Sequence, residues 1–120
     1  MGARTERTSD GGELVQGTLD MMILKTLARG SMHGYGIAQS IQRTSDEVLR
    51  VEEGSLYPAL HRLELDGILA AEWGVSDTNR RAKFYTITRS GKKQLVLETR
   101  SWERVAVTMA RILTSSRRTL

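Results

Sequence analysis

Basic side chains gather in one short stretch of this 120-residue chain. Between residues 76 and 93, six lysines and arginines stand against a single aspartate. Arg80, Arg81 and Lys83 begin that basic stretch and follow a run of small polar residues. Cations of this kind neutralise phosphate groups, so the excess indicates a polyanionic partner. For a charge excess alone, a solvated surface that only keeps the chain soluble is the alternative explanation.

A second group of polar side chains recurs at helical spacing in the segment GSLYPALHRLELDG, residues 54–67. A helix there places apolar residues on one face: Leu56, Ala59, Leu60 and Leu63. The polar residues left uncovered can hydrogen-bond to base edges: Ser55, Tyr57, His61 and Arg62. Two alternatives stay open at this point. Tyr57 could pack beside a neighbouring hairpin, and Arg62 could form an ion pair with Asp66, four residues on.

Several other chemistries are excluded by composition. The chain has no cysteine, which rules out disulfides and cysteine-ligated zinc, and two histidines are too few for a metal cluster. No nucleophile–base pair or phosphate loop is present, so we expect neither an enzyme nor a cofactor. Apolar runs are too short to span a membrane, and Glu6 stands where a myristoylation signal needs Ser or Thr. A cytoplasmic protein without a membrane partner is expected.

The elements that would position the basic and polar groups follow from periodicity. Residues 1–13 lack an apolar period and are expected to form a flexible arm. A first helix begins at a Thr18 cap and ends near Gly30. A second helix covers MHGYGIAQSIQRTS, and a third is capped by Gly54 or Ser55, with Pro58 in its first turn.

A β-hairpin is predicted after the third helix. Residues 68–74 and 83–88 form its strands, and the basic loop over residues 75–82 forms its tip. Three helices followed by such a ribbon make a winged helix-turn-helix over residues 14–89, mainly α with a small β-hairpin. In this arrangement Arg80, Arg81 and Lys83 lie on the wing.

The last helix, residues 90–113, is predicted to be a dimerisation helix, with Thr88 or Ser90 as its cap and a flexible tail over residues 114–120. Its apolar seam is close to a heptad: Leu95, Trp102, Val105, Met109 and Ile112. Trp102 has two interpretations. It is either a dimer-core residue, or it lines a cavity between subunits where a small aromatic or cationic effector stacks.

Three segments together resemble the PadR-type transcriptional regulators. They are HGYGI (33–37), EEGSLYPALHRLELDGIL (52–69) and KFYTITRSGKKQL (83–95), and the match spans roughly residues 14–113. The resemblance is to the short members, with a single C-terminal helix. It implies a winged helix-turn-helix fold and a dimeric repressor, and many members control genes for stress response or efflux.

The resemblance also implies which residues bind DNA. The family's motif at the second helix falls on His33, Gly34 and Tyr35, and its recognition-helix signature falls on Gly54, Ser55, Tyr57, Pro58 and Arg62. The wing departs from the Gly-Arg-Pro type of many members, because it reads Thr78-Asn79-Arg80-Arg81-Ala82. The expected DNA-binding set is Gly34, Tyr35, Ser55, Tyr57, His61, Arg62, Arg80, Arg81 and Lys83.

The resulting hypothesis is a homodimeric, sequence-specific regulator, acting as a repressor on double-stranded DNA. Two recognition helices would lie roughly 34 Å apart over a pseudo-palindromic operator. An effector at the dimer interface would release the DNA by favouring a misaligned state. The alternative is a winged-helix protein-interaction module without operator binding, since a fold alone does not settle function.

Overall fold

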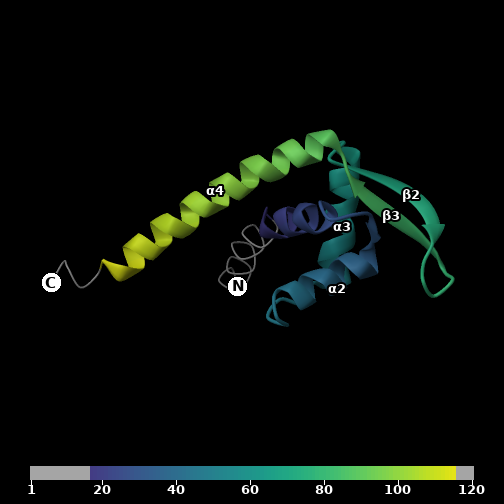
Figure 1. The fold of residues 1–120 in the computed structure, drawn as a ribbon, viewed down its shortest axis with the longest axis horizontal. Helices are drawn as coiled ribbons and strands as arrows, with labels where there is room; N and C mark the ends of the chain where they lie inside the picture. The colour runs from purple at the N-terminus through teal and green to yellow at the C-terminus, as the bar shows by residue number, and fades with distance from the viewer. Residues whose placement is uncertain (1–16, 116–120) are drawn as a thin grey trace, which may run out of the picture.

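The computed structural model describes residues 17–115 (Figure 1). The predicted arm, residues 1–13, and residues 116–120 of the predicted tail lie outside the described residues. A helix over residues 17–27, called the N-terminal helix below, precedes the labelled elements. These are β1 (Met32–His33), α2 (Gly34–Thr44), α3 (Glu53–Leu65), β2 (Leu69–Val75), β3 (Arg81–Ile87) and α4 (Arg89–Thr114). The predicted fold class, a mainly α winged helix-turn-helix with a small hairpin and a long last helix, is confirmed.

The sheet has one strand more than the sequence predicted. Its antiparallel order is β1-β3-β2, and the two residues of β1 pair with Tyr85 and Phe84 of β3. Met32 and His33 were expected inside the second helix, but His33 is extended and caps α2 from outside. Its Nδ1 accepts a hydrogen bond from the N–H of Gly36 at 3.0 Å. Because of this cap, α2 begins at Gly34, and the two preceding residues are free to pair with the hairpin.

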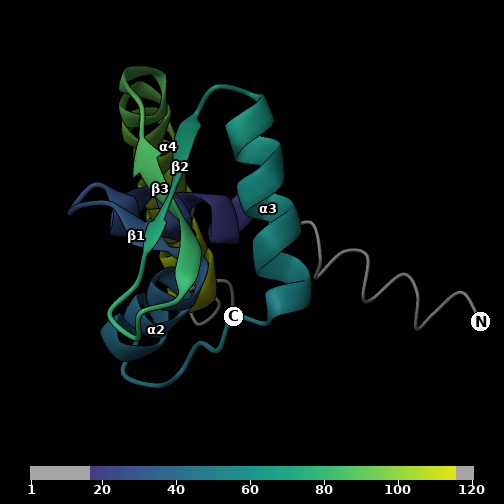
Figure 2. The ribbon, with the colours of Figure 1, turned by 90° about the vertical axis from the view of Figure 1, so that its right-hand side faces the viewer.

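The core lies where the N-terminal helix, α2 and α3 meet the inner end of the sheet (Figure 2). The predicted stripe of α3 is buried, and so are four leucine and isoleucine side chains of the N-terminal helix and two isoleucines of α2: Leu19, Ile23, Leu24, Leu27, Ile37 and Ile41. The fully buried large side chains are Ile23, Leu24, Leu27, Ile37, Leu56, Leu60, Leu63 and Leu69. Burial of these side chains is the dominant stabilising contribution and fixes how α3 sits against its neighbours.

Helix α3 begins earlier than the sequence predicted. Its N-cap is Glu52, which makes no side-chain cap hydrogen bond, so the expected caps Gly54 and Ser55 were wrong. The carbonyl of Glu52 accepts hydrogen bonds from the N–H groups of Ser55 and Leu56. Pro58 is therefore the sixth helical residue instead of a first-turn residue. The N–H that would reach the carbonyl of Gly54 is missing at that point.

The hairpin turn owes its shape to Asn79. The N–H of Asn79 donates to the carbonyl of Ser76 at 2.9 Å, and the N–H of Ser76 donates to the carbonyl of Arg80 at 2.8 Å. Asn79 has a φ of 62°, a left-handed conformation that asparagine tolerates better than most residues. The loop between the strands comprises residues 76–80 and is shorter than the predicted tip, so Arg81 already belongs to strand β3.

Helix α4 starts on a tight joint with the sheet. The Thr88 hydroxyl accepts a hydrogen bond from the N–H of Gly91 at 3.0 Å and donates to the carbonyls of Gly67 and Ile68, which confirms Thr88 as the cap. A Cβ on Gly91 would collide with the carbonyl oxygen of Ile68 and lie 2.7 Å from the Ile87 side chain. Only glycine permits this approach.

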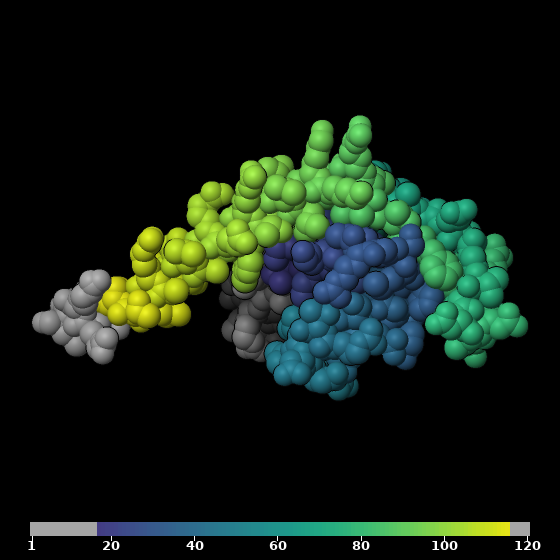
Figure 3. Space-filling model, viewed as in Figure 1, coloured from purple at the N-terminus to yellow at the C-terminus, as the bar shows by residue number. Residues whose placement is uncertain are grey.

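Beyond its first turns, α4 leaves the rest of the molecule and projects to one side (Figure 3). Every residue from 100 to 114 is exposed. Within residues 17–115, no helix is both long enough and apolar enough to cross a membrane.

Candidate nucleic-acid interface

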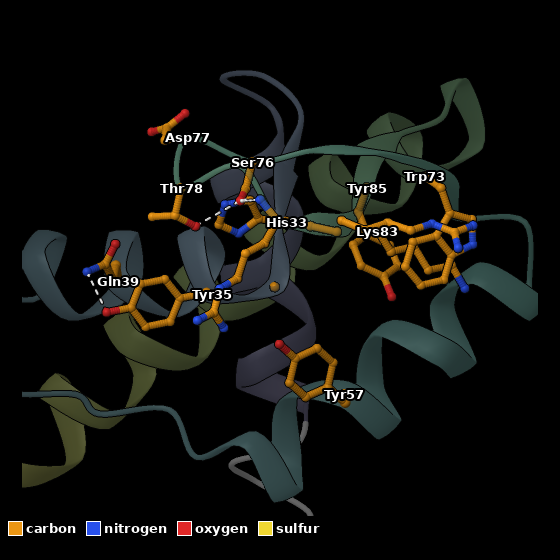
Figure 4. A pocket seen from close by; sticks show the side chains of 14 residues that line it. His33, Tyr35, Gln39, Tyr57, Trp73, Ser76, Asp77, Thr78, Lys83 and Tyr85 are labelled. Carbon is orange, nitrogen blue, oxygen red and sulfur yellow. Dashed lines mark hydrogen bonds between the residues drawn. The ribbon is translucent and has the colours of Figure 1, made fainter.

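A groove of about 860 Å³ separates the wing from the N-terminal ends of α2 and α3. Figure 4 shows side chains from both sides of it, with Tyr35 and Tyr57 on the helices and Trp73, Lys83 and Tyr85 on the hairpin. The groove brings together six members of the expected DNA-binding set: Gly34, Tyr35, Tyr57, Arg80, Arg81 and Lys83. Sequence positions nearly fifty residues apart thus share one surface with aromatic and cationic character.

The other three members of the set lie outside the groove lining. Ser55 and His61 are exposed on α3 and face solvent. Arg62 lies on a different flank of α3, against the N-terminal helix. The structure therefore does not bring Arg62 together with the wing.

Tyr57 and Gly34 form the contact between the starts of α3 and α2. A Cβ on Gly34 would come within 2.7 Å of Cε1 of the Tyr57 ring, so the ring occupies the space that a side chain would need. Gly34 is buried, while Tyr57 remains 44% exposed. The ring therefore packs against the start of α2, whereas the sequence offered the hairpin as its packing partner, and its exposed part lines the groove.

His33, Tyr35 and Gln39 shape the α2 side of the groove. The His33 ring meets Phe84 edge-on at 5.3 Å and stacks on Tyr35 at 6.5 Å between ring centroids. The amide of Gln39 donates a hydrogen bond to the Tyr35 hydroxyl at 3.1 Å (Figure 4). These contacts hold an exposed phenol at the mouth of the groove. His33 was not predicted to be a cap, although a polar residue just before a helix is a recognisable cap signal.

The three wing cations differ in their partners. The Arg81 guanidinium lies 4.6 Å above the ring of Trp73, a cation–π contact that orients it on the hairpin. The Lys83 ammonium pairs with Glu64 of α3 at 3.0 Å, and this pairing raises the pKa of Lys83. Among the described residues, Arg80 and Arg81 form no ion pair, so their charges are available to an external anion.

The ion pair of Arg62 differs from the one considered in the sequence analysis. Two guanidinium nitrogens of Arg62 donate to the two carboxylate oxygens of Asp20, at 2.8 and 3.0 Å, so Asp66 is not its hydrogen-bonded partner. This hydrogen bonding raises the pKa of Arg62, and weaker attraction to Asp66 and Glu98 acts in the same direction. The 42-residue separation from Asp20 explains why a local i,i+4 rule missed the pair.

A smaller groove of about 250 Å³ lies beside Trp102, between the N-terminal helix and α4. Its lining comprises Gly17, Thr18, Met21, Glu98, Ser101, Trp102 and Val105. The predicted seam of α4 divides here. Leu95 packs against the core of its own chain, whereas the exposed fraction of the seam side chains rises from 44% at Trp102 to 59% at Ile112.

Across residues 17–115, no group of three His, Cys, Asp or Glu side chains could hold a metal ion.

Comparisons with known proteins agree with this geometry. Residues 23–96 match the model of the transcriptional regulator PadR-like family. A transcriptional regulator of Mycobacterium tuberculosis is 35% identical over 94 residues, covering 78% of this chain and 84% of that protein. The negative transcriptional regulator PadR of Bacillus subtilis is 29% identical over 77 residues, covering 64% of this chain and 42% of that protein.

Solved structures with a similar fold also include transcriptional regulators. The structure of a transcriptional regulator from Clostridium thermocellum superposes with a TM-score of 0.75 at 30% identity, covering 82% of this chain and 96% of that one. A family of transcriptional regulators also agrees with the expectation that the chain is not an enzyme. Because the family model matches more than half of this chain, the chain belongs to the PadR-like family of transcriptional regulators.

Proposed function

We propose that the protein is a homodimeric, sequence-specific DNA-binding regulator that acts as a repressor. The observation that carries this proposal is the groove that places the start of α3, the start of α2 and the wing cations on one face. A duplex needs such a face, since one element must contact bases while cations contact the backbone on either side. The negative regulator of Bacillus subtilis supports the sign of regulation.

In this proposal the exposed face of α3 enters the major groove. Ser55, Tyr57 and His61 offer hydroxyl, phenol and imidazole groups to base edges, and all three side chains are exposed. Arg80, Arg81 and Lys83 contact phosphates from the wing, and Tyr35 adds a hydroxyl beside them. Since chromosomal DNA is the proposed ligand, the expected cytoplasmic location is part of the same proposal.

Dimerisation is proposed to occur through α4. Trp102, Val105, Met109 and Ile112 recur along one face of a helix and are exposed in the single chain, which favours an isologous contact with a second copy. Such a dimer would set two recognition helices roughly 34 Å apart on a pseudo-palindrome. The groove beside Trp102 is where a small aromatic or cationic effector would act.

The decisive experiment measures the affinity of the full chain for the duplex upstream of its own gene across a salt series. Replacing both Arg80 and Arg81 with alanine should weaken binding to every duplex and reduce the salt slope by about 1.8, because each phosphate contact contributes about 0.9.

A matched control replaces Lys92 and Lys93, which are exposed at the start of α4 and do not line the groove. This variant removes the same charge and should leave the slope nearly unchanged. Equal slopes for wild type and the wing variant would refute the wing assignment. Absence of duplex affinity in the wild type at physiological salt would favour the protein-interaction module.

A further inference from the structure

Helix α3 is held by ion pairs on both flanks of its buried stripe. At 100° per residue, Arg62 and Glu64 lie about 160° apart around the helix, one on each side of the stripe. Glu64 pairs with Lys83 of the wing, and Arg62 pairs with Asp20 of the N-terminal helix. Each flank is therefore tied to a different element, and both ties lie in the C-terminal half of the helix.

The Arg62 pair is the more constrained of the two. Both carboxylate oxygens of Asp20 accept from separate guanidinium nitrogens, which fixes the relative orientation of the two planes as well as their distance. The Asp20 side chain is only 13% exposed, compared with 40% for Arg62. A carboxylate this close to the protein interior depends on its partner, because an unpaired charge there is unfavourable.

The surroundings of Arg62 also disfavour a nucleic-acid phosphate. Besides Asp20, the carboxylates of Asp66 and Glu98 act electrostatically on the guanidinium. A phosphate approaching it would meet three negative charges. Neither Arg62 nor Asp20 lines the groove between α3 and the wing.

We propose that Arg62 is a positioning residue, which together with Asp20 fixes the orientation of the recognition helix and does not itself bind DNA. This inference rests on the proposed function, because it concerns how α3 is presented to the duplex. It replaces the direct DNA contact expected for Arg62 from the sequence. Its consequence is that Asp20, an acidic residue in another helix, supports DNA binding.

The test compares Arg62→Ala, Asp20→Ala and the double variant in the full chain, with the duplex upstream of its own gene and a salt series. Positioning predicts that either single change weakens binding about fivefold, the effect of one partly exposed ion pair. The double variant should bind no worse than the singles, and all salt slopes should match the wild type. A direct contact predicts instead that Arg62→Ala lowers the slope by about 0.9, while Asp20→Ala leaves binding unchanged or tighter.

Asp77→Ala is the matched control for charge. Asp77 is exposed in the wing loop and forms no ion pair in the described part of the chain. Removing it should strengthen DNA binding slightly, as the loss of one negative charge must, whereas Asp20→Ala should weaken it. The milder Asp20→Asn, checked by thermal unfolding, covers the case in which the alanine variants fold poorly, and it should weaken binding in the same direction.

The two proposals fail in different ways. Wild-type chain that binds no duplex overturns the proposed function. Wild-type chain that binds, together with Asp20 variants that bind as well as the wild type or better, overturns only the positioning role.

Discussion

The winged body and the C-terminal half of α4 have similar apolar periodicity but different burial. In the body, the stripes of the N-terminal helix, α2 and α3 meet one another, and Ile23, Ile37 and Leu60 are completely buried. In α4, Trp102, Val105 and Met109 also share a face, but each is about half exposed. Apolar periodicity therefore predicts which face of a helix will be buried. It does not predict whether the same chain or a second chain buries that face.

These two regions suit the two tasks that we propose for the molecule, DNA binding by the body and dimerisation by α4. The body completes its core within one chain and can hold the α3 face and the wing rigidly. The half-exposed helix leaves an unpartnered apolar face that a second copy would bury. Three experiments test this division.

The largest effect is expected for Val105→Glu. Val105 and Val107 have similar exposed fractions, 47% and 54%, but lie about 160° apart around α4, and only Val105 is on the seam. A glutamate at position 105 would meet its symmetry mate in a dimer, and the dissociation constant should rise by about a hundredfold or more. Sedimentation of the purified chain measures this.

Val107→Glu is the matched control, because it adds the same charge to the opposite face. It should leave the oligomeric state unchanged. If both variants dissociate equally, or if neither does, the seam is not the interface and the two regions differ for another reason.

A smaller effect is expected at the joint between the two regions. Gly91→Ala should destabilise the fold by about 1–3 kcal/mol, because the new Cβ would overlap the Ile68 carbonyl and crowd Ile87. Gly54→Ala is the matched control in α3, where no atom lies within 4 Å of the added Cβ. That change should be neutral or stabilise by up to about 1 kcal/mol. Urea unfolding compares the two, and a stabilising Gly91→Ala would contradict the close contact.

The smallest effect is expected inside the groove. Gly34→Ala should destabilise by about 1 kcal/mol, because the Tyr57 ring must move away from the added Cβ. In a Tyr57→Ala background the same substitution should cost nothing. A double-mutant cycle by thermal unfolding measures the difference. An equal cost in both backgrounds would show that Gly34 is required for some reason other than the ring.

Local sequence signals predicted much of the body correctly. The stripe of α3, the Thr88 cap and the hairpin depend on residues within a few positions of one another, so spacing and residue type are sufficient. The start of α3 and strand β1 were missed. Glu52, the N-cap of α3, is not one of the residue types that usually cap a helix, and its side chain makes no cap hydrogen bond. Strand β1 has only two residues and exists because β3 lies beside it.

The order of residues is enough to show which residues are apolar at helical spacing, where the basic stretch lies and which family motifs are present. Which charged side chains meet depends on how the helices pack. Arg62 could have paired with Asp66 or contacted DNA, and it pairs with Asp20, 42 positions away, because the core places α3 across the N-terminal helix. Long-range pairs follow from packing, and packing depends on every buried side chain at once.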